Sequence, residues 1–419
     1  HSSIHQNLPN LFKVVLIINI IDPDKFLQKK IPNSQIQINM KLSRYVEHST
    51  SLNVTDFSDA VKAMTISKRL LGVSGIWPLE IRDSLFISVA IYGFVFNILA
   101  LLDLIKYIKD FRYIMANVME NMLVLMTMIK ISMLRIKYRS LSRFLIETKA
   151  DYTADNYKND EEKLIFFKYN RISYRFVVVL FPWSTIIILL YYFKSVLPNV
   201  LMVMTNSSVE YKLPYKIKPL LKPHDAKSYA FGCIHEFLRT IMVISGYVGT
   251  DCLVTCTGFH LTGQLAIFNF RVKDVLNDSY GSRRGIQKIV LRHHRIIRLA
   301  DILEDSFNIV IGQQLLGTTV QLCISSYQML SSFAVVERAG IITFVMYECL
   351  LLSTLFAYCY MGECLLEESM NLCEALYLCD WYELSTNDVK SICICMIRAR
   401  KPLRLTCAKF CVVSLRTFT

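Results

Sequence analysis

Residues 176–193 read FVVVLFPWSTIIILLYYF, a stretch without a single charged side chain. A helix of about 20 apolar residues spans the roughly 30 Å hydrocarbon core of a bilayer, because each residue adds about 1.5 Å. Lipid offers the backbone no hydrogen-bonding partner, so such a segment has to form a helix. The stretch therefore predicts a membrane-spanning helix, and the rest of the sequence decides whether it is one of several.

Further stretches with few or no charges lie on both sides of it. Those long enough to span a bilayer are residues 84–102, 112–135, 229–261, 306–332 and 340–362. Another apolar stretch begins at residue 403 and reaches the last residue, 419. We therefore expect an all-α membrane protein with seven transmembrane helices, of which the seventh is truncated.

The composition agrees with a membrane protein. The 419 residues have 53% hydrophobic and 19% charged side chains and a mean hydropathy of +0.37. This excludes a disordered chain, a collagen-like chain and a small disulfide-stapled domain. The net charge of +13 would suit nucleic acid if the basic residues clustered on one face, but they lie between the apolar blocks. All 13 cysteines follow residue 232, many in apolar stretches, and we expect reduced thiols.

The distribution of basic residues predicts an orientation. The loops after even-numbered spans (136–172, 263–305 and 365–404) carry 21 Lys and Arg, against nine in the loops after odd-numbered spans (105–112, 195–228 and 333–339). The first set is expected in the cytoplasm. The N-terminal segment 1–83 would lie on the same side; Met40 and Met64 are candidate starts, so residues 1–39 are a candidate non-native extension.

Three glycosylation sequons test the same topology. The sequon at Asn206 lies in the second loop of the opposite face and is the expected glycosylation site. The sequons at Asn53 and Asn277 would be unused.

Ionisable groups at membrane depth need a physical reason, because each costs roughly 2.5–3.5 kcal/mol on insertion scales. Glu236 and Arg239 are three apart on one helix face and are expected to pair locally. Glu120 and Lys130 are expected to snorkel or to meet neighbouring helices. For Glu348 the alternatives are interhelical hydrogen bonding and a packing or gating role. The amides at 313, 314, 321 and 328 are expected to bond between helices.

A small-molecule site is expected in the outer halves of the spans. Its candidate ligand-binding residues are Met119, Met122, Ser184, Ile187, Tyr191, Phe237, Ile241 and Tyr347. Ser184, Ile187 and Tyr191 are spaced i, i+3 and i+7, which places them on one helix face. Methionines and aromatic rings with an isolated hydroxyl suit a volatile, mostly apolar ligand. Ordinary helix packing is the simpler interpretation for any single residue.

The sequence shows no pattern typical of an enzyme. It contains none of the common nucleophile, zinc-protease, phosphate-loop or paired-carboxylate motifs. We therefore expect no catalytic residues, no cofactor and no metal site. His293 and His294 lie in a basic stretch that favours a solvated or headgroup-facing helix over metal binding.

The C-terminal part resembles a known family. It reads YCYMGECLLEESMNLCEALYLCDWYELS and then KSICICMIRARKPLRLTCAKFCVVSLRTFT. This resembles insect odorant receptors, with matching positions Gly362, Glu363, Ser369, Ala375, Tyr377, Trp381, Arg398, Ala399, Lys401, Pro402, Leu403, Thr406, Ala408, Lys409, Phe410, Ser414, Leu415, Thr417 and Phe418. The segment LLGVSGIWP, residues 70–78, resembles the family's entry to the first span.

The resemblance implies an odorant-gated, non-selective cation channel in the plasma membrane of olfactory neurons. It implies a heterotetramer in which tuning subunits bind odorant and an odorant receptor co-receptor completes the channel. Residues 84–362 would form the ligand-binding region, and residues 363–419 the cytoplasmic anchor helices and the start of the pore-lining seventh helix, most of which is missing. The connection 263–305 is short, which resembles a tuning subunit rather than the co-receptor.

Three other classes remain as alternatives. A gustatory-type channel would show a Thr-Tyr and Gln-Phe signature in the seventh span, which RLTCAKF at 404–410 lacks. A G-protein-coupled receptor would need an N-terminus outside the cell. A membrane enzyme or transporter would need inward-facing catalytic groups or an inverted repeat.

Overall fold

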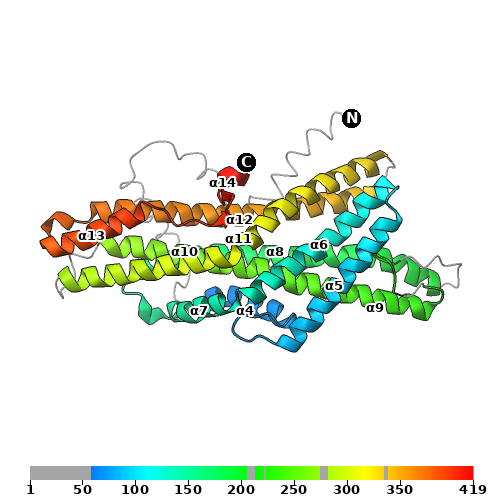
Figure 1. Cartoon of the computed structure of the whole chain (residues 1–419), viewed down its shortest axis with the longest axis horizontal. Coiled ribbons are helices and arrows are strands. Elements are labelled where there is room, and N and C mark those ends of the chain that lie inside the picture. Colours follow the sequence, from blue (N-terminus) through cyan, green and yellow to red (C-terminus); the bar gives the residue numbers. More distant parts are fainter. Residues whose placement is uncertain (1–57, 205–212, 221–222, 274–281, 335–337, 419) are drawn as a thin grey trace.

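The computed structural model describes residues 58–204, 213–220, 223–273, 282–334 and 338–418 (Figure 1). The described residues are almost entirely helical. The helices are α4 (Ser58–Val73), α5 (Asp83–Lys106), α6 (Phe111–Ile136), α7 (Tyr138–Thr148), α8 (Asp160–Met204), α9 (Ala226–Met242), α10 (Gly249–Lys273), α11 (Ser282–Ala334), α12 (Arg338–Leu378), α13 (Thr386–Ala399) and α14 (Leu415–Phe418). The expected glycosylation site Asn206, like Asn53 and Asn277, lies outside the described residues.

Short elements connect these helices. They are the 3-10 turns η1 (Lys149–Tyr152), η2 (Ala154–Asn156) and η5 (Trp381–Glu383), the π-helical turn η3 (Val243–Val248), and the strands β1 (Thr406–Cys407) and β2 (Cys411–Val412). The π turn joins α9 to α10 without a break, so the two form one long rod. Such turns are rare and occur frequently at functional sites.

Six helical rods are long and apolar enough to cross a bilayer. They are α5, α6, α8, the rod of α9 to α10, α11 and α12. Each contains one of the six full spans predicted from the sequence, so an all-α membrane protein is confirmed. The α5 span is the most apolar, with a mean hydropathy of 2.4 in its best window. Its side chains are largely exposed, as expected of a helix that faces lipid.

The connections 136–172 and 263–305, which were interpreted as loops, are mostly helical, and so is the segment 365–404, for which the family resemblance implied anchor helices. Their helices in the described chain are α7, the start of α8, the ends of α10 and α12, the first half of α11, and α13. In Figure 1, α10 to α13 continue side by side past the apolar region. These segments bury an apolar stripe that includes Leu299 and Leu303 on α11 and Leu372 and Leu376 on α12.

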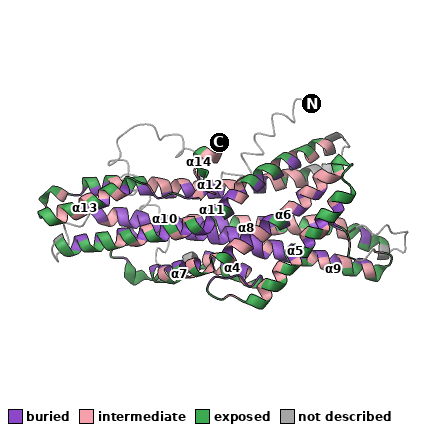
Figure 2. Ribbon diagram, in the orientation of Figure 1, coloured by how far each residue is buried: buried purple, intermediate pink, exposed green. Residues whose placement is uncertain are grey.

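The core follows α10, which runs through the centre of the bundle. Its residues are buried almost without interruption, as the purple band in Figure 2 shows. Phe259, Leu261 and Leu265 are fully buried there. Helices α8, α11 and α12 pack around α10 and present their other faces outward.

The chain after residue 402 differs from the expected seventh helix. Residues 406–412 form a two-stranded hairpin in which Thr406 pairs with Val412 and Cys407 with Cys411. Ala408 and Lys409 have φ angles of 49° and 66° at its turn, which a helix does not allow. Helix begins again only with α14 at Leu415.

This hairpin packs closely against α12. A Cβ atom added to Gly362 would lie 2.3 Å from the carbonyl oxygen of Val413. Only glycine therefore lets the backbone of the hairpin approach α12 at this point.

Candidate ligand-binding site

A non-helical segment, residues 213–220, folds back into the end of the bundle where α8 and α9 meet (Figure 1). We call it the inserted segment. Tyr215 and Ile217 are its buried side chains, with exposed fractions of 5% and 6%. Leu213 packs so closely on α9 that a Cβ at Gly232 would lie 2.7 Å from it. The segment is therefore part of the packed interior.

Two buried carboxylates hold the backbone of the inserted segment. The Tyr215 N–H donates to Glu236 Oε2 at 3.0 Å, and the Lys216 N–H donates to Glu120 Oε2 at 2.7 Å. These bonds supply partners to backbone N–H groups that belong to no helix or sheet. Glu120 lies on α6 and Glu236 on α9, so the segment connects two helices.

Two asparagines of α6 complete the attachment. The side-chain amides of Asn117 and Asn121 donate to the Lys216 carbonyl oxygen at 2.7 and 3.0 Å. Both side chains are nearly inaccessible. Buried amides of this kind are satisfied by definite partners, so the position of the segment is specified by its neighbours.

The ring of Tyr215 contacts a cation and a second ring. The Arg239 guanidinium is 3.5 Å from the centre of the Tyr215 ring. The Tyr191 ring stacks nearly parallel to the Tyr215 ring, with centroids 5.8 Å apart and an angle of 12° between the planes. The Tyr215 hydroxyl is 3.4 Å from Thr240 Oγ1. Residues 191, 215 and 239 thus form a compact aromatic and cationic group.

A second aromatic group lies on the other side of Arg239. The Phe96 ring is 5.4 Å from the guanidinium and stacks on His235 with centroids 6.0 Å apart. Tyr92 contacts His235 edge-on at 5.4 Å and donates to its backbone carbonyl at 2.6 Å. Arg239 therefore lies between two π systems, which stabilise a desolvated cation by roughly 0.5–2 kcal/mol each.

The predicted site residues are distributed as follows. Met119, Ser184 and Ile187 are buried, Met122, Tyr191, Phe237 and Tyr347 are half-buried, and Ile241 is exposed.

The half-buried residues lie near the aromatic group. The Tyr191 hydroxyl donates to Glu120 Oε1 at 2.7 Å. Phe237 contacts Tyr192 with ring centroids 5.4 Å apart. Tyr347 on α12 is close enough to Arg239 for an electrostatic interaction.

Two of the predicted residues are less suited to a ligand. The Ser184 hydroxyl donates to the Leu180 carbonyl of its own helix at 2.5 Å, so it is already satisfied. Ile241 is 38% exposed and lies with Ile234 and Leu238 on the outer face of α9. The structure does not bring Ile241 together with the other candidates.

Glu236 and Arg239 do not form the local pair expected from the sequence. Arg239 donates to the backbone carbonyl of Glu120, whereas Glu236 accepts from the Tyr215 N–H. No ion pair joins the two among the described residues. Both side chains face a backbone that enters from a loop, and that backbone supplies a better-aligned donor to the carboxylate than the neighbour on the same helix does.

The remaining ionisable groups meet other helices. Lys130 forms an ion pair with Asp251 of α10, and both are buried. Ser326 of α11 donates to Glu348 of α12 at 2.9 Å, in agreement with interhelical hydrogen bonding. These contacts lie where the sequence predicted that charged side chains need partners.

The Lys130 pair belongs to a network in the middle of the bundle. Tyr358 of α12 donates to Asp251 Oδ1 at 2.5 Å. The Lys130 ammonium lies 3.4 Å from the centre of the Tyr247 ring in the π turn. Tyr247 in turn donates to Gln314 Oε1 of α11 at 2.9 Å. The network therefore connects four of the six spanning rods.

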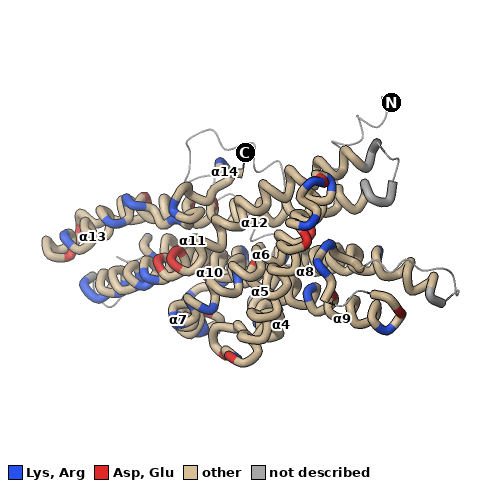
Figure 3. Tube along the Cα trace, turned by 45° about the vertical axis from the view of Figure 1, so that its right-hand side comes forward, with Lys and Arg blue, Asp and Glu red and all other residues tan. Residues whose placement is uncertain are grey.

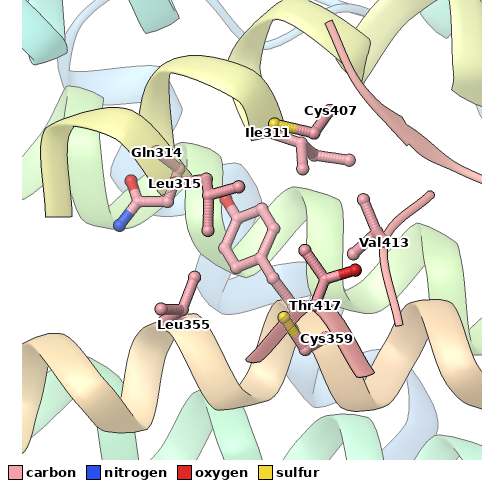
Figure 4. Close-up of a pocket in the computed structure, with 9 residues that line it drawn as sticks. Ile311, Gln314, Leu315, Leu355, Cys359, Cys407, Val413 and Thr417 are labelled. Atoms are coloured by element: carbon pink, nitrogen blue, oxygen red, sulfur yellow. The ribbon is translucent and has the colours of Figure 1, made fainter. Parts of the chain in front are cut away.

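A small cavity separates this network from the C-terminal hairpin. It has a volume of about 10 Å³ and lies between α11, α12 and the chain after residue 402 (Figure 4). Its labelled walls include Gln314, Leu355, Cys407 and Thr417. That volume admits at most one water molecule, so it is too small for an organic ligand.

The sequence patterns did not indicate the inserted segment. The connection 195–228 was interpreted as a loop, and Tyr215, Tyr92, Phe96 and His235 were not singled out. One signal was present: Leu213, Tyr215 and Ile217 alternate with polar residues and proline. Alternation of this kind indicates an extended segment with one buried face.

Comparison with known proteins gives consistent results. The sequence profile of the family described as 7tm Odorant receptor matches residues 110–419. Odorant receptor 13a of Drosophila melanogaster is 27% identical over 228 residues, which cover 49% of this chain and 53% of that protein. The Odorant receptor coreceptor of Anopheles gambiae is 31% identical over 136 residues, or 32% of this chain and 28% of that protein. The chain thus spans about half or less of the length of these relatives.

A solved structure shares the fold. The insect olfactory receptor OR5 from Machilis hrabei superposes with a TM-score of 0.69 at 17% identity, over 86% of this chain and 94% of that one. The same receptor in complex with eugenol gives a TM-score of 0.67 at 17% identity, over 86% of this chain and 95% of that one. The arrangement of helices in this chain is therefore that of an insect olfactory receptor.

Proposed function

Because this chain belongs to the insect odorant receptor family, we propose that it binds a volatile odorant and gates a non-selective cation channel in the plasma membrane of olfactory neurons. The chain is a multi-pass membrane protein. The observation that carries the proposal is the aromatic group around Arg239, at the end of the bundle where α8 and α9 meet. It offers rings, a cation and hydroxyls inside an apolar shell, which suits a small, mostly apolar molecule.

The ligand site we propose combines α6, α8, α9 and α12. Its residues are Met119, Met122, Ile187, Tyr191, Phe237 and Tyr347; Ser184, whose hydroxyl is already bonded within α8, and Ile241, which faces outward, are left out. The eugenol complex of the Machilis hrabei receptor supports binding of a small organic molecule by this fold. Burial of an odorant would contribute about 25 cal/mol per Å² of apolar area. An odorant that binds the open arrangement more tightly shifts the channel toward it.

We propose a topology of seven spans with the N-terminus in the cytoplasm. Lys and Arg gather along α7 and on the ends of α11 and α13, while the middle of the bundle carries few charges (Figure 3). Basic residues on that end support a cytoplasmic location. An epitope tag at the N-terminus should then stain only permeabilised cells. Staining of intact cells would favour a G-protein-coupled receptor instead.

The partner we propose is the odorant receptor co-receptor, in a heterotetramer. The anchor formed by α12 and α13 supports an assembly surface. A groove of about 710 Å³ lies between these helices and is lined by Met370, Tyr377, Met396 and Ile397 among others. Ile394 and Ile397 are 66% and 68% exposed, although the anchor lies outside the apolar spans. Exposed apolar side chains in water mark an interaction surface.

The decisive experiment records currents from cells that express this chain with and without a co-receptor. We expect currents only with both chains, and only for some members of a diverse volatile panel. Tyr191→Ala and Tyr347→Ala should raise the effective odorant concentration at unchanged surface expression. Tyr191→Phe is the matched control, because it keeps the ring and loses only the bond to Glu120. Unchanged dose-response curves in both alanine variants would contradict the proposed site.

A separate test addresses the partner. Ile397→Glu places a charge on the exposed face of α13 and should reduce co-purification with the co-receptor. Glu383→Lys, also outside the spans but on the η5 turn, is the charge-change control. Equal recovery of both variants with the co-receptor would contradict the assembly surface.

A further inference from the structure

The Tyr215 ring occupies a slot whose walls belong to other elements. The Arg239 guanidinium covers one face, 3.5 Å from the ring centre. The Tyr191 ring lies nearly parallel to the Tyr215 ring, with the two centroids 5.8 Å apart. Thr240 stands 3.4 Å from the hydroxyl. A cation, a ring and a hydrogen-bonding group in this arrangement are the usual means by which a protein recognises a hydroxylated benzene ring.

The walls of the slot are fixed independently of Tyr215. Arg239 donates to the backbone carbonyl of Glu120, which is part of α6. The Tyr191 hydroxyl donates to the carboxylate of the same residue at 2.7 Å. Neither bond involves the inserted segment, so displacement of Tyr215 does not by itself break them.

Individually weak hydrogen bonds hold the inserted segment. Its backbone is fixed around Lys216 by Glu120, Glu236, Asn117 and Asn121, and the Lys218 N–H donates to the Leu99 carbonyl at 3.3 Å. None of these bonds lies within a helix or a sheet, so their loss would not unfold a secondary-structure element. Each hydrogen bond contributes about 0.5–1.5 kcal/mol net, and more where a carboxylate accepts. A ligand can therefore compete with the segment.

We propose that this slot is an aromatic-ligand site which the chain fills with its own Tyr215, and that a volatile phenol displaces that side chain. The tyrosine side chain has the shape of para-cresol, so it specifies the ligand class: a small benzene ring with one hydroxyl. The inference rests on the proposed odorant-binding function and names the ligand that function would use. Tethered Tyr215 competes at a high effective concentration, so it also sets the threshold for the ligand.

The test removes the tethered competitor. Tyr215→Ala is compared with the wild type and with Ile217→Ala, a matched control from the same segment whose side chain packs into an apolar cluster that does not include Tyr215. The probes are para-cresol and 4-methylcyclohexanol, which differ in aromaticity at similar size. Binding to the purified full chain in detergent is measured from the ligand-dependent shift of the thermal unfolding midpoint.

We expect Tyr215→Ala to bind para-cresol about tenfold more tightly than the wild type, because the competitor is gone and the cation–π and stacking contacts remain. The gain should be small for 4-methylcyclohexanol and absent in Ile217→Ala. Should Tyr215→Ala fail to fold, Tyr215→Leu retains the volume without the aromatic face, and should bind para-cresol more tightly than the wild type by a smaller factor.

Two results would overturn the inference. One is an equal gain for para-cresol and 4-methylcyclohexanol; the other is an equal gain in Tyr215→Ala and Ile217→Ala. Current recordings with the co-receptor separate this inference from the proposed function. If para-cresol binding improves in Tyr215→Ala while no volatile evokes current, the slot stands and the channel proposal fails. If aliphatic volatiles evoke current but para-cresol binding is unchanged, the channel stands and the slot fails.

Discussion

The network around Lys130 leads to a specific prediction of how substitutions change the free energy of unfolding. The Lys130 side chain is 0% exposed and that of Asp251 is 12% exposed. Asp251→Asn therefore leaves a buried ammonium without its counter-ion, which costs about 3–5 kcal/mol. Lys130→Met should cost less, because Asp251 keeps the hydrogen bond from Tyr358. The double variant should recover most of the loss, since no uncompensated charge remains.

The assay measures the thermal unfolding midpoint of the fluorescently tagged chain in detergent. Size-exclusion chromatography after heating reports how much folded protein remains. Tyr358→Phe serves as the matched control, because it removes one hydrogen bond and should cost about 1–2 kcal/mol. The expected order of stability places Asp251→Asn lowest and the double variant above it. If the loss of stability in the double variant equals the sum of the losses in the two single variants, the ion pair is not what stabilises this region.

Two further predictions concern the parts outside the network. Gly362→Ala should cost about 1–3 kcal/mol, because the new Cβ meets the Val413 carbonyl at 2.3 Å; Gly72→Ala, which meets no atom within 4 Å, is the helical control and should not destabilise. Burial, aided by Arg398, lowers the pKa of His293 to about 4. The unfolded chain then takes up a proton near pH 6.5 but the folded chain does not. Stability should fall from about pH 6.5 to about pH 4, and His293→Gln should flatten that dependence of the unfolding midpoint.

The spans were predictable because their ends are marked by charge. Residues 84–102 were expected and α5 covers Asp83–Lys106; residues 112–135 were expected and α6 covers Phe111–Ile136. Where a helix continues beyond the apolar span, only a stripe of its residues is apolar. The predicted helices therefore ended where the uniformly apolar stretches ended. Helix α11 is 53 residues long, about twice its predicted span, because its first half buries a stripe rather than a whole surface.

Which helix face points inward was harder to predict, for a reason specific to membranes. On α9 the inward face carries Glu236, Arg239 and Thr240, while Ile234 and Ile241 face outward. The rule that apolar side chains point inward holds when water surrounds the protein. In lipid the apolar side chains are satisfied outside, so an apolar residue such as Ile241 can lie on the outer face, and the polar face that holds Tyr215 was interpreted as a self-contained pair.

The buried charges show why spacing along a helix predicts the existence of a contact but not its partner. At membrane depth Lys130, Glu120 and Glu236 each require a counterpart, and the structure supplies one for each. These partners lie on another helix or in the inserted segment, from 21 to 121 residues away in sequence. For the Glu236 carboxylate, a donor three residues away on the same helix competes poorly with a backbone N–H that has no partner in a helix or sheet. The same argument draws attention to Tyr215, because the buried carboxylates Glu120 of α6 and Glu236 of α9 are both directed toward the inserted segment, a non-helical part of the described chain.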